Sequence, residues 1–393
     1  MTAPTPADAK PTPHLAADLP DNRVYNFSSG PCALPHEVLQ QVQEELLNYQ
    51  GNGMSVMEMS HRSKPIVEIT ASATALLREL LDLPAHYDVI LVGGGATMQF
   101  GMIPLNLVSP ASVDGPGSRV DYVHSGAWAK KAIADARVTG ADVHVVWDGT
   151  AEDYVRLPDP ASVHSTEDSL YLHLTSNETI GGLQWKDFPT CQAPIVADMS
   201  SDFLSRKLPV ERFGLIYAGA QKNIGPAGVT VVILRDDLLA RSKSDRVPAR
   251  VNYLDYANHV KGESMLNTPP VFQIYIVELV LQWLKAKGGV AWAAEAAARR
   301  SGVVYDAIAR AGGGGFYRCP IHAEFRSNMN VVFRLPSEDL EARFIAQATE
   351  QGLDGLKGHR SVGGCRASLY NAMPQEGAEA LASFMHDFAR THG

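Results

Sequence analysis

The sequence predicts an α/β protein, in which a large domain with a mainly parallel sheet flanked by helices precedes a smaller α+β domain. Three observations support this prediction. Short β-favouring runs alternate with helical patterns between residues 88 and 234, which is typical of parallel strands joined by helical crossovers. Helical patterns alone fill residues 271–312. A shorter mixture of strands and helices then begins at residue 329.

The N-terminal part predicts a disordered tail followed by two helices. Residues 1–22 are rich in Pro, Ala and Thr, a composition that is typical of disordered segments. Apolar residues at helical spacing then predict helices over 36–49 and 66–83, and Pro35 precedes the first of them, as proline often does at a helix start.

The strands of the sheet follow in alternation with helices. Helices are expected over 96–108 and 127–140, the second ending at Gly140. The predicted strands are apolar, β-favouring runs bounded by turn residues, over 88–95, 119–126, 142–149, 169–177, 193–203, 215–220 and 228–234.

The C-terminal part predicts a change of architecture. Its expected elements are helices over 271–289 and 292–312, a strand over 329–336, a helix over 338–352, a strand over 365–372 and a helix over 376–392. We therefore expect a large domain over 23–290 and a small domain over 291–393, with the boundary near 285–300.

Composition limits the classes of partner and location. With 393 residues, 45% of them hydrophobic, the chain is long enough for two domains. Its net charge of −9 argues against nucleic acid as the main partner. No apolar run of membrane-spanning length and no signal-peptide pattern is seen, so we expect a cytoplasmic protein with no membrane partner. The cysteines form no CxxC pair, which predicts neither a zinc site nor a disulfide framework; they are Cys32, Cys191, Cys319 and Cys365.

One lysine, Lys222, lies in the turn between the last two predicted strands of the sheet. An ammonium group beside buried strands is costly unless it is paired or neutralised. Spacing alone leaves two interpretations open. Lys222 is either a solvated turn residue or a partly desolvated lysine whose amine does covalent chemistry.

Two further motifs lie at predicted strand ends, where α/β sheets bind ligands. In GGGATMQF (93–100), glycines and a helix start would leave backbone N–H groups free for a phosphate, and Thr97 adds a hydroxyl; an ordinary glycine turn is the alternative. Asp198 follows a buried strand, so it either pairs with a cation or protonated ring nitrogen, or caps the next segment. A lysine, an aspartate and a phosphate turn are together what pyridoxal phosphate requires.

Aromatic and basic residues complete the set of candidates. Trp128 stands at a strand-to-helix turn, where an indole either stacks on a flat ring or belongs to the core. Two segments, MSHRSKPI (59–66) and KGHRSVGGCRASLYNA (357–372), contain arginines. Arginine binds carboxylate and phosphate groups bidentately, so arginines in one cleft would indicate an anionic substrate; solvated surface arginines are the alternative.

Taken together, these stretches resemble the phosphoserine aminotransferase family, within class V of the fold-type I pyridoxal-phosphate enzymes. The resemblance extends from about residue 24 to the C-terminus, and it implies a sheet of the seven-stranded type and a homodimer with shared active sites. The motifs are NFSSGPCALP, MSVMEMSHRS, GGGATMQF, HLTSNETIGG, VADMSSDFLSR, YAGAQKNIGPAG, NTPP and KGHRSVGGCRASLYNAMP.

The resemblance implies a role for each matching residue. The catalytic pair would be Lys222, as the Schiff-base lysine, and Asp198, beside the pyridine nitrogen. The other cofactor contacts would be Gln221, Ala96 and Thr97 at the phosphate, Thr179 at the ring hydroxyl, Trp128 on the ring, and Asn267 and Thr268 at the phosphate of the neighbouring subunit. The substrate contacts would be Ser29, His61, Arg62, His359, Arg360 and Arg366. The family has an arginine where this chain has Thr97, so only the backbone N–H of that residue is expected to contribute.

The activity that the resemblance implies is transamination between L-glutamate and 3-phosphohydroxypyruvate, giving O-phospho-L-serine and 2-oxoglutarate in serine biosynthesis. It also allows the phosphorylated four-carbon oxo acid of vitamin B6 synthesis as a substrate. The alternatives are another class V enzyme, such as an alanine–glyoxylate-type aminotransferase or a cysteine desulfurase, and a non-catalytic protein that carries pyridoxal phosphate. A desulfurase would need a reactive cysteine, and Cys365, at the start of a strand, fits a structural thiol better.

Overall fold

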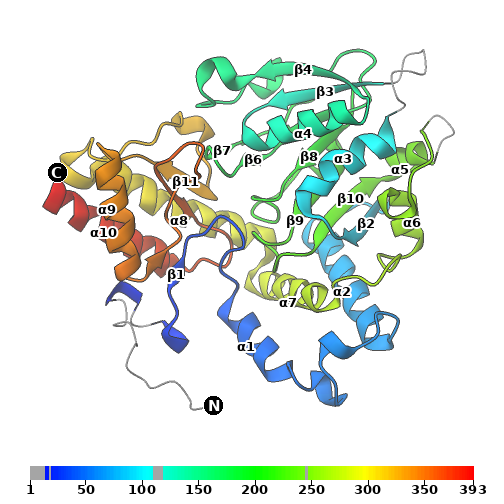
Figure 1. Cartoon of the computed structure of the whole chain (residues 1–393), viewed down its shortest axis with the longest axis horizontal. Coiled ribbons are helices and arrows are strands. Elements are labelled where there is room, and N and C mark those ends of the chain that lie inside the picture. Colours follow the sequence, from blue (N-terminus) through cyan, green and yellow to red (C-terminus); the bar gives the residue numbers. More distant parts are fainter. Residues whose placement is uncertain (1–13, 17–18, 109–117, 244–246) are drawn as a thin grey trace.

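The computed structural model describes residues 14–16, 19–108, 118–243 and 247–393. Its largest element is a sheet of seven strands in the order β2-β10-β9-β8-β5-β3-β4 (Figure 1). The strands are β2 (Tyr87–Val92), β3 (Arg119–His124), β4 (Asp142–Asp148), β5 (Leu172–Thr175), β8 (Ile195–Asp198), β9 (Phe213–Gly219) and β10 (Thr230–Arg235). Only β10 runs antiparallel to its neighbours. The predicted mainly parallel sheet is therefore confirmed.

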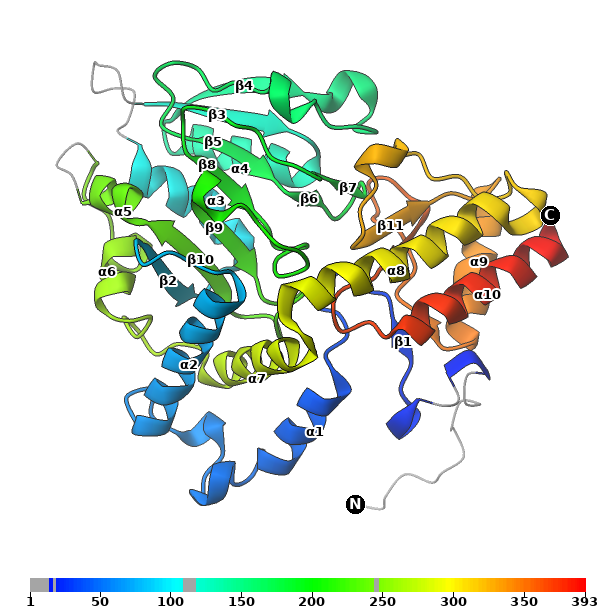
Figure 2. The same cartoon turned by 180° about the vertical axis from the view of Figure 1, so that it is seen from behind.

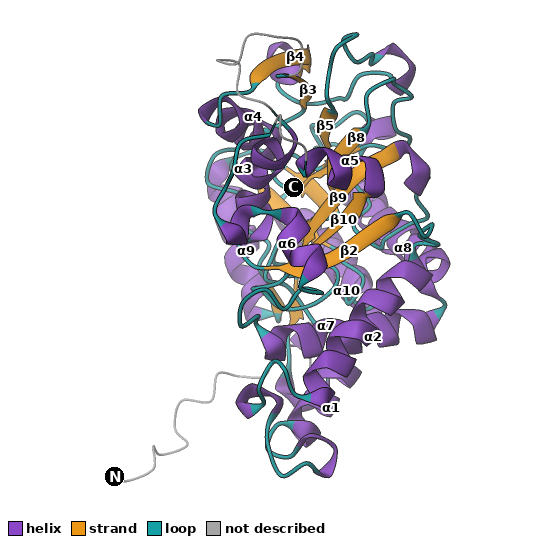
Figure 3. Cartoon of the chain, turned by 90° about the vertical axis from the view of Figure 1, so that its right-hand side faces the viewer, coloured by secondary structure: helices purple, strands orange, loops and turns teal. Residues whose placement is uncertain are grey.

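Successive residues of each strand point to opposite sides of the sheet, and in the central strands β8, β9 and β10 both sides are buried. In β10, Val231 and Ile233 belong to one hydrophobic cluster, while Val232 and Leu234 belong to another. The first cluster includes residues of α2 (Lys64–Leu80) and α7 (Val271–Lys287). The second includes residues of α3 (Gly95–Leu107), α4 (Ala127–Val138), α5 (Asp236–Ser242) and α6 (Tyr256–Lys261). Figure 3 shows the strands running between these helices.

The carboxyl ends of the parallel strands lie at one edge of the sheet. Thr175 and Asp198, the last residues of β5 and β8, are register partners. Thr230 pairs with Gly219 on one side and with Val92 on the other, so the ends of β9 and β2 flank the same residue. Asp198 itself ends β8, and the segments that follow β2 and β9 carry the glycine turn and Lys222, so this edge of the sheet brings the three together.

A smaller domain continues from the long helix α8 (Gly289–Arg310), which follows α7 after a left-handed residue, Gly288 (Figure 2). It contains the antiparallel pair β11 (Asn330–Phe333) and β13 (Cys365–Ser368), with α9 (Glu338–Glu350) and α10 (Gln375–His392). Phe344 contacts Phe384 and Phe388 in its core. The division into domains over 23–290 and 291–393 stays a prediction.

The N-terminal segment packs against this smaller domain, although the predicted division assigns it to the large one. β1 (Tyr25–Asn26) pairs in parallel with β12 (Leu353–Asp354), and Phe27 is buried in the small-domain core. Ala16 belongs to the same core. Most of the predicted disordered tail, residues 1–13 and 17–18, lies outside the described residues.

Several elements differ from the predictions. The helix expected over 36–49 is shorter: α1 spans His36–Glu45, and Asn48 adopts a φ of −151° and a ψ of 84°, which a helix does not accommodate. The hairpin β6 (Asn177–Glu178) with β7 (Leu183–Gln184) and the short helices α5 and α6 were not predicted. In the part of the chain that the structure describes, no helix combines the length and apolar character needed to cross a membrane.

Candidate active site

Lys222 lies in the turn that follows β9, and it lines a cavity of about 200 Å³ at the carboxyl edge of the sheet. Its Nζ donates a hydrogen bond of 2.6 Å to Thr179 Oγ1. Burial lowers the pKa of the Lys222 amine to about 8, with Asp198 opposing the change. At physiological pH, a much larger fraction of the Lys222 amine is therefore neutral than in a surface lysine. This environment supports the second interpretation, a lysine that is poised for covalent chemistry.

The cavity brings together ten of the residues singled out from the sequence. They come from the end of β8, from the helix starts and turns that follow β2, β3, β6 and β9, from the N-terminal segment and from the small domain, and they are Ser29, Ala96, Thr97, Trp128, Thr179, Asp198, Gln221, Lys222, His359 and Arg366. The cavity lies between the two domains, because His359 and Arg366 belong to the smaller one.

Asp198 is a buried carboxylate, and 4% of its surface is exposed. Its Oδ1 accepts a hydrogen bond of 2.9 Å from the Ser200 N–H, and burial raises its pKa, with Ser200 and Lys222 opposing the change. Among the described residues, no cation lies within ion-pair distance of it. A buried carboxylate in a cavity, without a cation of its own, fits a ligand that brings a protonated nitrogen.

Two other groups in the cavity wall also lack partners. Trp128 Nε1 and Thr175 Oγ1 are buried and make no hydrogen bond among the described residues. The indole ring of Trp128 lies with its centroid 5.7 Å from Lys222 Nζ. Together with Asp198, these groups fit a flat, polar cofactor seated between the tryptophan and the end of β8, as pyridoxal phosphate would be.

The glycine turn ends at the N-terminus of α3, on the wall of the same cavity. Gly94 and Gly95 have φ values of 93° and 64°, conformations that glycine adopts without strain. Met98 is the first residue of the helix whose N–H bonds back, to Gly94 O, so the N–H groups of Ala96 and Thr97 have no acceptor within the helix. A thirteen-residue helix with free N–H groups at a cavity is suited to a phosphate group.

Glu178 is a residue of the site that was not predicted. Its buried carboxylate accepts hydrogen bonds from Ala129 N at 3.2 Å and Ser125 Oγ at 3.3 Å, at the N-terminus of α4. It occupies the space that a side chain at Gly126 would fill. Burial raises its pKa to about 7. Glu178 therefore fixes the start of α4, which carries Trp128. In the sequence, only the position of Glu178 beside Thr179 in the HLTSNETIGG motif could have indicated this role.

Arg366 is the buried cation of the site. Its Nη2 donates to Ser29 Oγ at 2.7 Å and its Nη1 to the Thr179 carbonyl at 3.4 Å, while its Nε has no acceptor. Among the described residues it has no carboxylate partner, and burial lowers its pKa. A buried guanidinium without a counterion is a binding group for an anion. His359 lies on the loop before β13 and lines the cavity, whereas Arg360 is exposed and does not.

Besides Arg360, four predicted residues lie away from this cavity within the chain. His61 and Arg62 precede α2 and line a separate cavity of about 600 Å³. Asn267 and Thr268 are exposed on the segment that leads into α7. The single chain therefore supplies one part of the predicted set and leaves these four residues on other surfaces.

Cys365 does not have the environment of a reactive thiol. It is buried in β13, and burial raises the pKa of its thiol. Thiolate chemistry requires the opposite shift. A persulfide-forming role of the kind that a desulfurase needs is therefore not supported by this cysteine.

The chain is similar to known proteins in both sequence and structure. The family model described as aminotransferase class-V matches residues 24–381. The phosphoserine aminotransferase of Laribacter hongkongensis is 50% identical over 370 residues, which cover 94% of this chain and 99% of that protein. The solved phosphoserine aminotransferase of Bacillus circulans subsp. alkalophilus has a TM-score of 0.89 at 46% identity, covering 95% of this chain and 100% of that one. The pyridoxal-phosphate-bound phosphoserine aminotransferase of Trichomonas vaginalis has a TM-score of 0.83 at 38% identity, covering 92% and 99%.

Proposed function

The chain belongs to the class-V aminotransferases, and from this membership we propose that it transfers the amino group of L-glutamate to 3-phosphohydroxypyruvate, with pyridoxal phosphate as cofactor. The products would be O-phospho-L-serine and 2-oxoglutarate, as in serine biosynthesis. The observation that supports this proposal most strongly is the convergence of Lys222, Asp198 and Arg366 on one cavity. These side chains supply an amine, a buried carboxylate and an anion-binding guanidinium.

The residues of the cavity divide into those that would hold the cofactor and those that would hold the substrate. Lys222 would bind the cofactor covalently, and Asp198 would keep a proton on its ring nitrogen. The remaining cofactor contacts would be Ala96, Thr97 and Gln221 at the phosphate, Thr179 at the ring hydroxyl and Trp128 on the ring face. When bound, pyridoxal phosphate supplies an electron sink that makes a proton on the substrate Cα removable.

Lys222 would also move that proton. Its low pKa means that the amine is readily neutral, and a neutral amine accepts a proton whereas an ammonium group does not. Its hydrogen bond to Thr179 Oγ1 holds Nζ at the wall of the cavity in which the cofactor would bind. The same amine serves both half-reactions, because the second is the reverse of the first with a different substrate.

The substrate side of the cavity suits doubly anionic molecules. Arg366, held by Ser29, would bind one anionic group, and His359 and Arg360 would bind the other. Glutamate offers two carboxylates, and phosphoserine offers a carboxylate and a phosphate. One pocket can therefore serve both substrates, which an enzyme with a ping-pong mechanism requires.

Replacing Arg366 tests the anion pocket. We expect Arg366→Met to raise KM for glutamate and phosphoserine by about tenfold to a hundredfold, since charge-assisted hydrogen bonds contribute about 1.5–3 kcal/mol. The affinity for pyridoxal phosphate should change little, because Arg366 bonds Ser29 and the Thr179 backbone and is not needed at the cofactor phosphate. Steady-state kinetics and cofactor titration measure the two quantities. An equal loss of both would place Arg366 in a structural role.

Four of the residues that lie away from the cavity would complete it in a homodimer. We propose that Asn267 and Thr268 approach the cofactor phosphate of the neighbouring subunit. His61 and Arg62 would reach its substrate, since within one chain they line a different cavity. If the site is shared between subunits, two variants that are each inactive can together form an active dimer, and if it is not shared they cannot.

Mixing two inactive variants tests this sharing. Lys222→Ala and Arg62→Ala chains, refolded or exchanged together, should form hybrid dimers in which one of two sites has both native residues. Activity should then recover to about a quarter of the wild-type value, since about half of the dimers are hybrids. No recovery, with hybrid dimers shown by mass spectrometry, would mean that Arg62 serves its own chain.

The strongest competing function is another class-V aminotransferase that acts on a substrate without a second anion. Alanine and phosphoserine differ at this point, so the relative rates of amino transfer from each to a 2-oxo acid separate the two functions. The buried, unpaired Arg366 favours the doubly anionic substrate. A protein that merely carried the cofactor would transfer nothing from either donor.

A further inference from the structure

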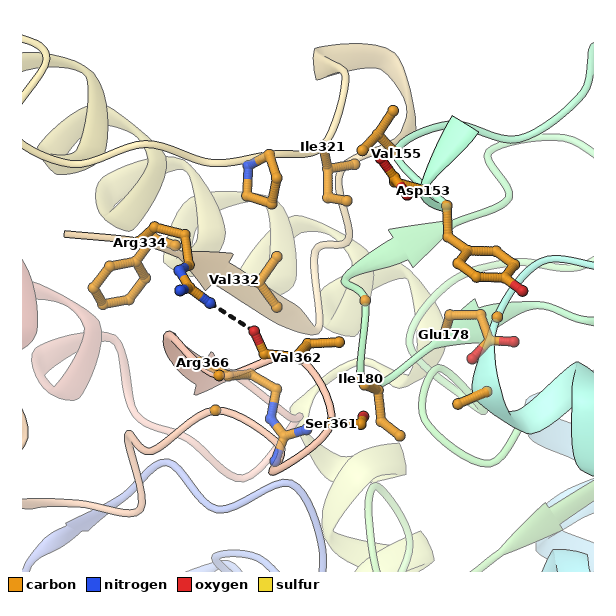
Figure 4. A pocket seen from close by; sticks show the side chains of 18 of the residues that line it. Asp153, Val155, Glu178, Ile180, Ile321, Val332, Arg334, Ser361, Val362 and Arg366 are labelled. Carbon is orange, nitrogen blue, oxygen red and sulfur yellow. Dashed lines mark hydrogen bonds between the residues drawn. The ribbon is translucent and has the colours of Figure 1, made fainter. Parts of the chain in front are cut away.

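A cleft of about 510 Å³ between the two domains adjoins the cofactor cavity (Figure 4). The two share Ile180 and Arg366 in their walls. One side of the cleft is formed by the loop over residues 358–364, which we call the histidine loop because it carries His359. The opposite side is formed by Tyr154, Val155 and Glu178 of the large domain. The histidine loop therefore separates the cleft from the substrate side of the cavity.

The histidine loop closes on itself at its base and is exposed at its tip. Gly358 N donates to Gly364 O at 2.9 Å, and Gly363 N donates to His359 O at 2.8 Å. The His359 ring bonds Ser361 Oγ at 2.7 Å, so the conformation of the loop determines the direction of this ring. Val362 at the tip is 51% exposed. A glycine-rich, exposed segment has a large conformational entropy to lose, and it needs an anchor to keep one shape.

Arg334, directly after β11, contacts this tip. Its Nη1 donates to the Val362 carbonyl at 2.6 Å, the bond that Figure 4 marks. Gly364 has a φ of +71°, and a side chain there would lie 2.6 Å from Arg334 Cδ. The glycine thus lets the arginine stem pack directly beneath the loop.

The Arg334 guanidinium also binds a carboxylate that lies outside the histidine loop. Its Nε lies 2.9 Å from Glu341 Oε1, on α9, and this carboxylate also accepts from the Leu335 N–H at 3.3 Å. The Glu341 side chain is 8% exposed and that of Arg334 is 33% exposed. The Arg334 backbone is fixed as well, because it exchanges two hydrogen bonds with Arg318, of 3.0 and 2.8 Å. Arg334 therefore links three elements: α9, the end of β11 and the histidine loop.

We infer that Arg334 is a positioning residue, which holds the histidine loop in the conformation that presents His359 to the substrate side of the Lys222 cavity. Arg334 does not line that cavity itself, so it acts through the loop. The inference rests on the proposed function, because the loop matters for catalysis only if His359 and Arg360 bind a substrate anion. The order of the loop can nevertheless be measured without any substrate.

The test compares Arg334→Met with Arg318→Met as its matched control. Arg318 lines the same cleft and neighbours Arg334 across the strand ends, but its side chain forms no hydrogen bond or ion pair among the described residues. Both variants remove one positive charge from the cleft. Because Arg334→Met leaves the buried Glu341 carboxylate unpaired, the double variant Arg334→Met/Glu341→Gln is measured beside it.

Hydrogen exchange of the substrate-free holoenzyme is the first readout. We expect the amides of Gly358, Val362 and Gly363 to exchange at least about tenfold faster in both Arg334 variants and at the wild-type rate in Arg318→Met. Unchanged exchange in the double variant would overturn the inference, since the loop would then keep its order without Arg334.

Kinetics give the second readout. KM for phosphoserine should rise about tenfold in both Arg334 variants, with kcat within about threefold and cofactor affinity unchanged; a tenfold change corresponds to about 1.4 kcal/mol. Arg334→Lys, which can bond only one of the two partners well, should fall between wild type and Arg334→Met. Equal KM values in Arg334→Met and Arg318→Met would overturn the positioning role. If the wild type itself shows no transfer from phosphoserine, the proposed function fails, while the exchange result still decides whether Arg334 anchors the loop.

Discussion

Lys222→Ala should reduce amino transfer by about 10⁴-fold or more, since it removes both the covalent attachment of the cofactor and the group that moves the Cα proton. The fold should survive, because Lys222 lies in a turn and its amine makes a single side-chain hydrogen bond, to Thr179. Steady-state turnover with phosphoserine and 2-oxoglutarate measures the loss. Thermal unfolding checks that the variant is folded.

Lys186 offers a control for this variant. Partial burial, with Arg206 nearby, lowers its pKa to about 8, the same value as for Lys222. Its Nζ bonds Gln184, however, and it does not line the cavity. Lys186→Ala should therefore keep most of the activity. Substantial turnover by Lys222→Ala would contradict the assignment of the catalytic amine.

Asp198→Asn is expected to have the second largest effect. The change keeps the shape of the side chain but removes the charge that would hold a proton on the cofactor nitrogen. Losing one such preorganised electrostatic contact costs about 10²- to 10³-fold in kcat. The affinity for pyridoxal phosphate should fall as well, since the buried carboxylate has no other cation within ion-pair distance among the described residues.

Asp202→Asn controls for the effect of removing a buried charge near Asp198. Asp202 is also buried, but it pairs with Arg206 at 3.2 Å and does not line the cavity. We expect this variant to lose stability, because its partner Arg206 is left unpaired, and to keep kcat per folded molecule. If Asp198→Asn and Asp202→Asn lowered kcat equally, the special role of Asp198 would be contradicted.

The sheet can be predicted well from the sequence, because the pattern that indicates each strand lies within a few neighbouring residues. Buried strands of this mainly parallel sheet, such as β9 and the antiparallel β10, are continuous apolar runs, and their ends carry turn residues. Once the strands are parallel, topology places the residues that follow them at one edge. The convergence of Asp198, Lys222 and the glycine turn could therefore be predicted without knowledge of distances.

Other features depend on contacts that leave no local pattern. β1 and β12 are two residues each and pair across more than three hundred residues of chain, so neither shows a strand period. The role of Glu178 depends on Gly126, whose missing side chain makes room for the carboxylate. The anchor from Arg334 to Val362 likewise joins two segments of the small domain that only the fold brings together.

The sequence did not predict that His61 and Arg62 lie outside the Lys222 cavity of their own chain, and the reason is a different one. The resemblance assigned Asn267 and Thr268 to the neighbouring subunit, but it gave His61 and Arg62 a substrate role without indicating which subunit they serve. Within one chain these residues lie outside the Lys222 cavity. We propose that a second copy of the chain brings them to it, and the hybrid-dimer experiment tests that proposal.

The visible absorbance of the purified holoenzyme, before and after addition of O-phospho-L-serine, tests the central claim most directly, with L-alanine as the control. The lysine-bound cofactor is yellow, and a competent amino donor removes this colour in a single half-reaction. We predict that phosphoserine bleaches the band and that alanine at the same concentration does not, because only phosphoserine offers a second anion to the pocket around Arg366. A band that alanine bleaches and phosphoserine leaves unchanged would contradict the proposed substrate.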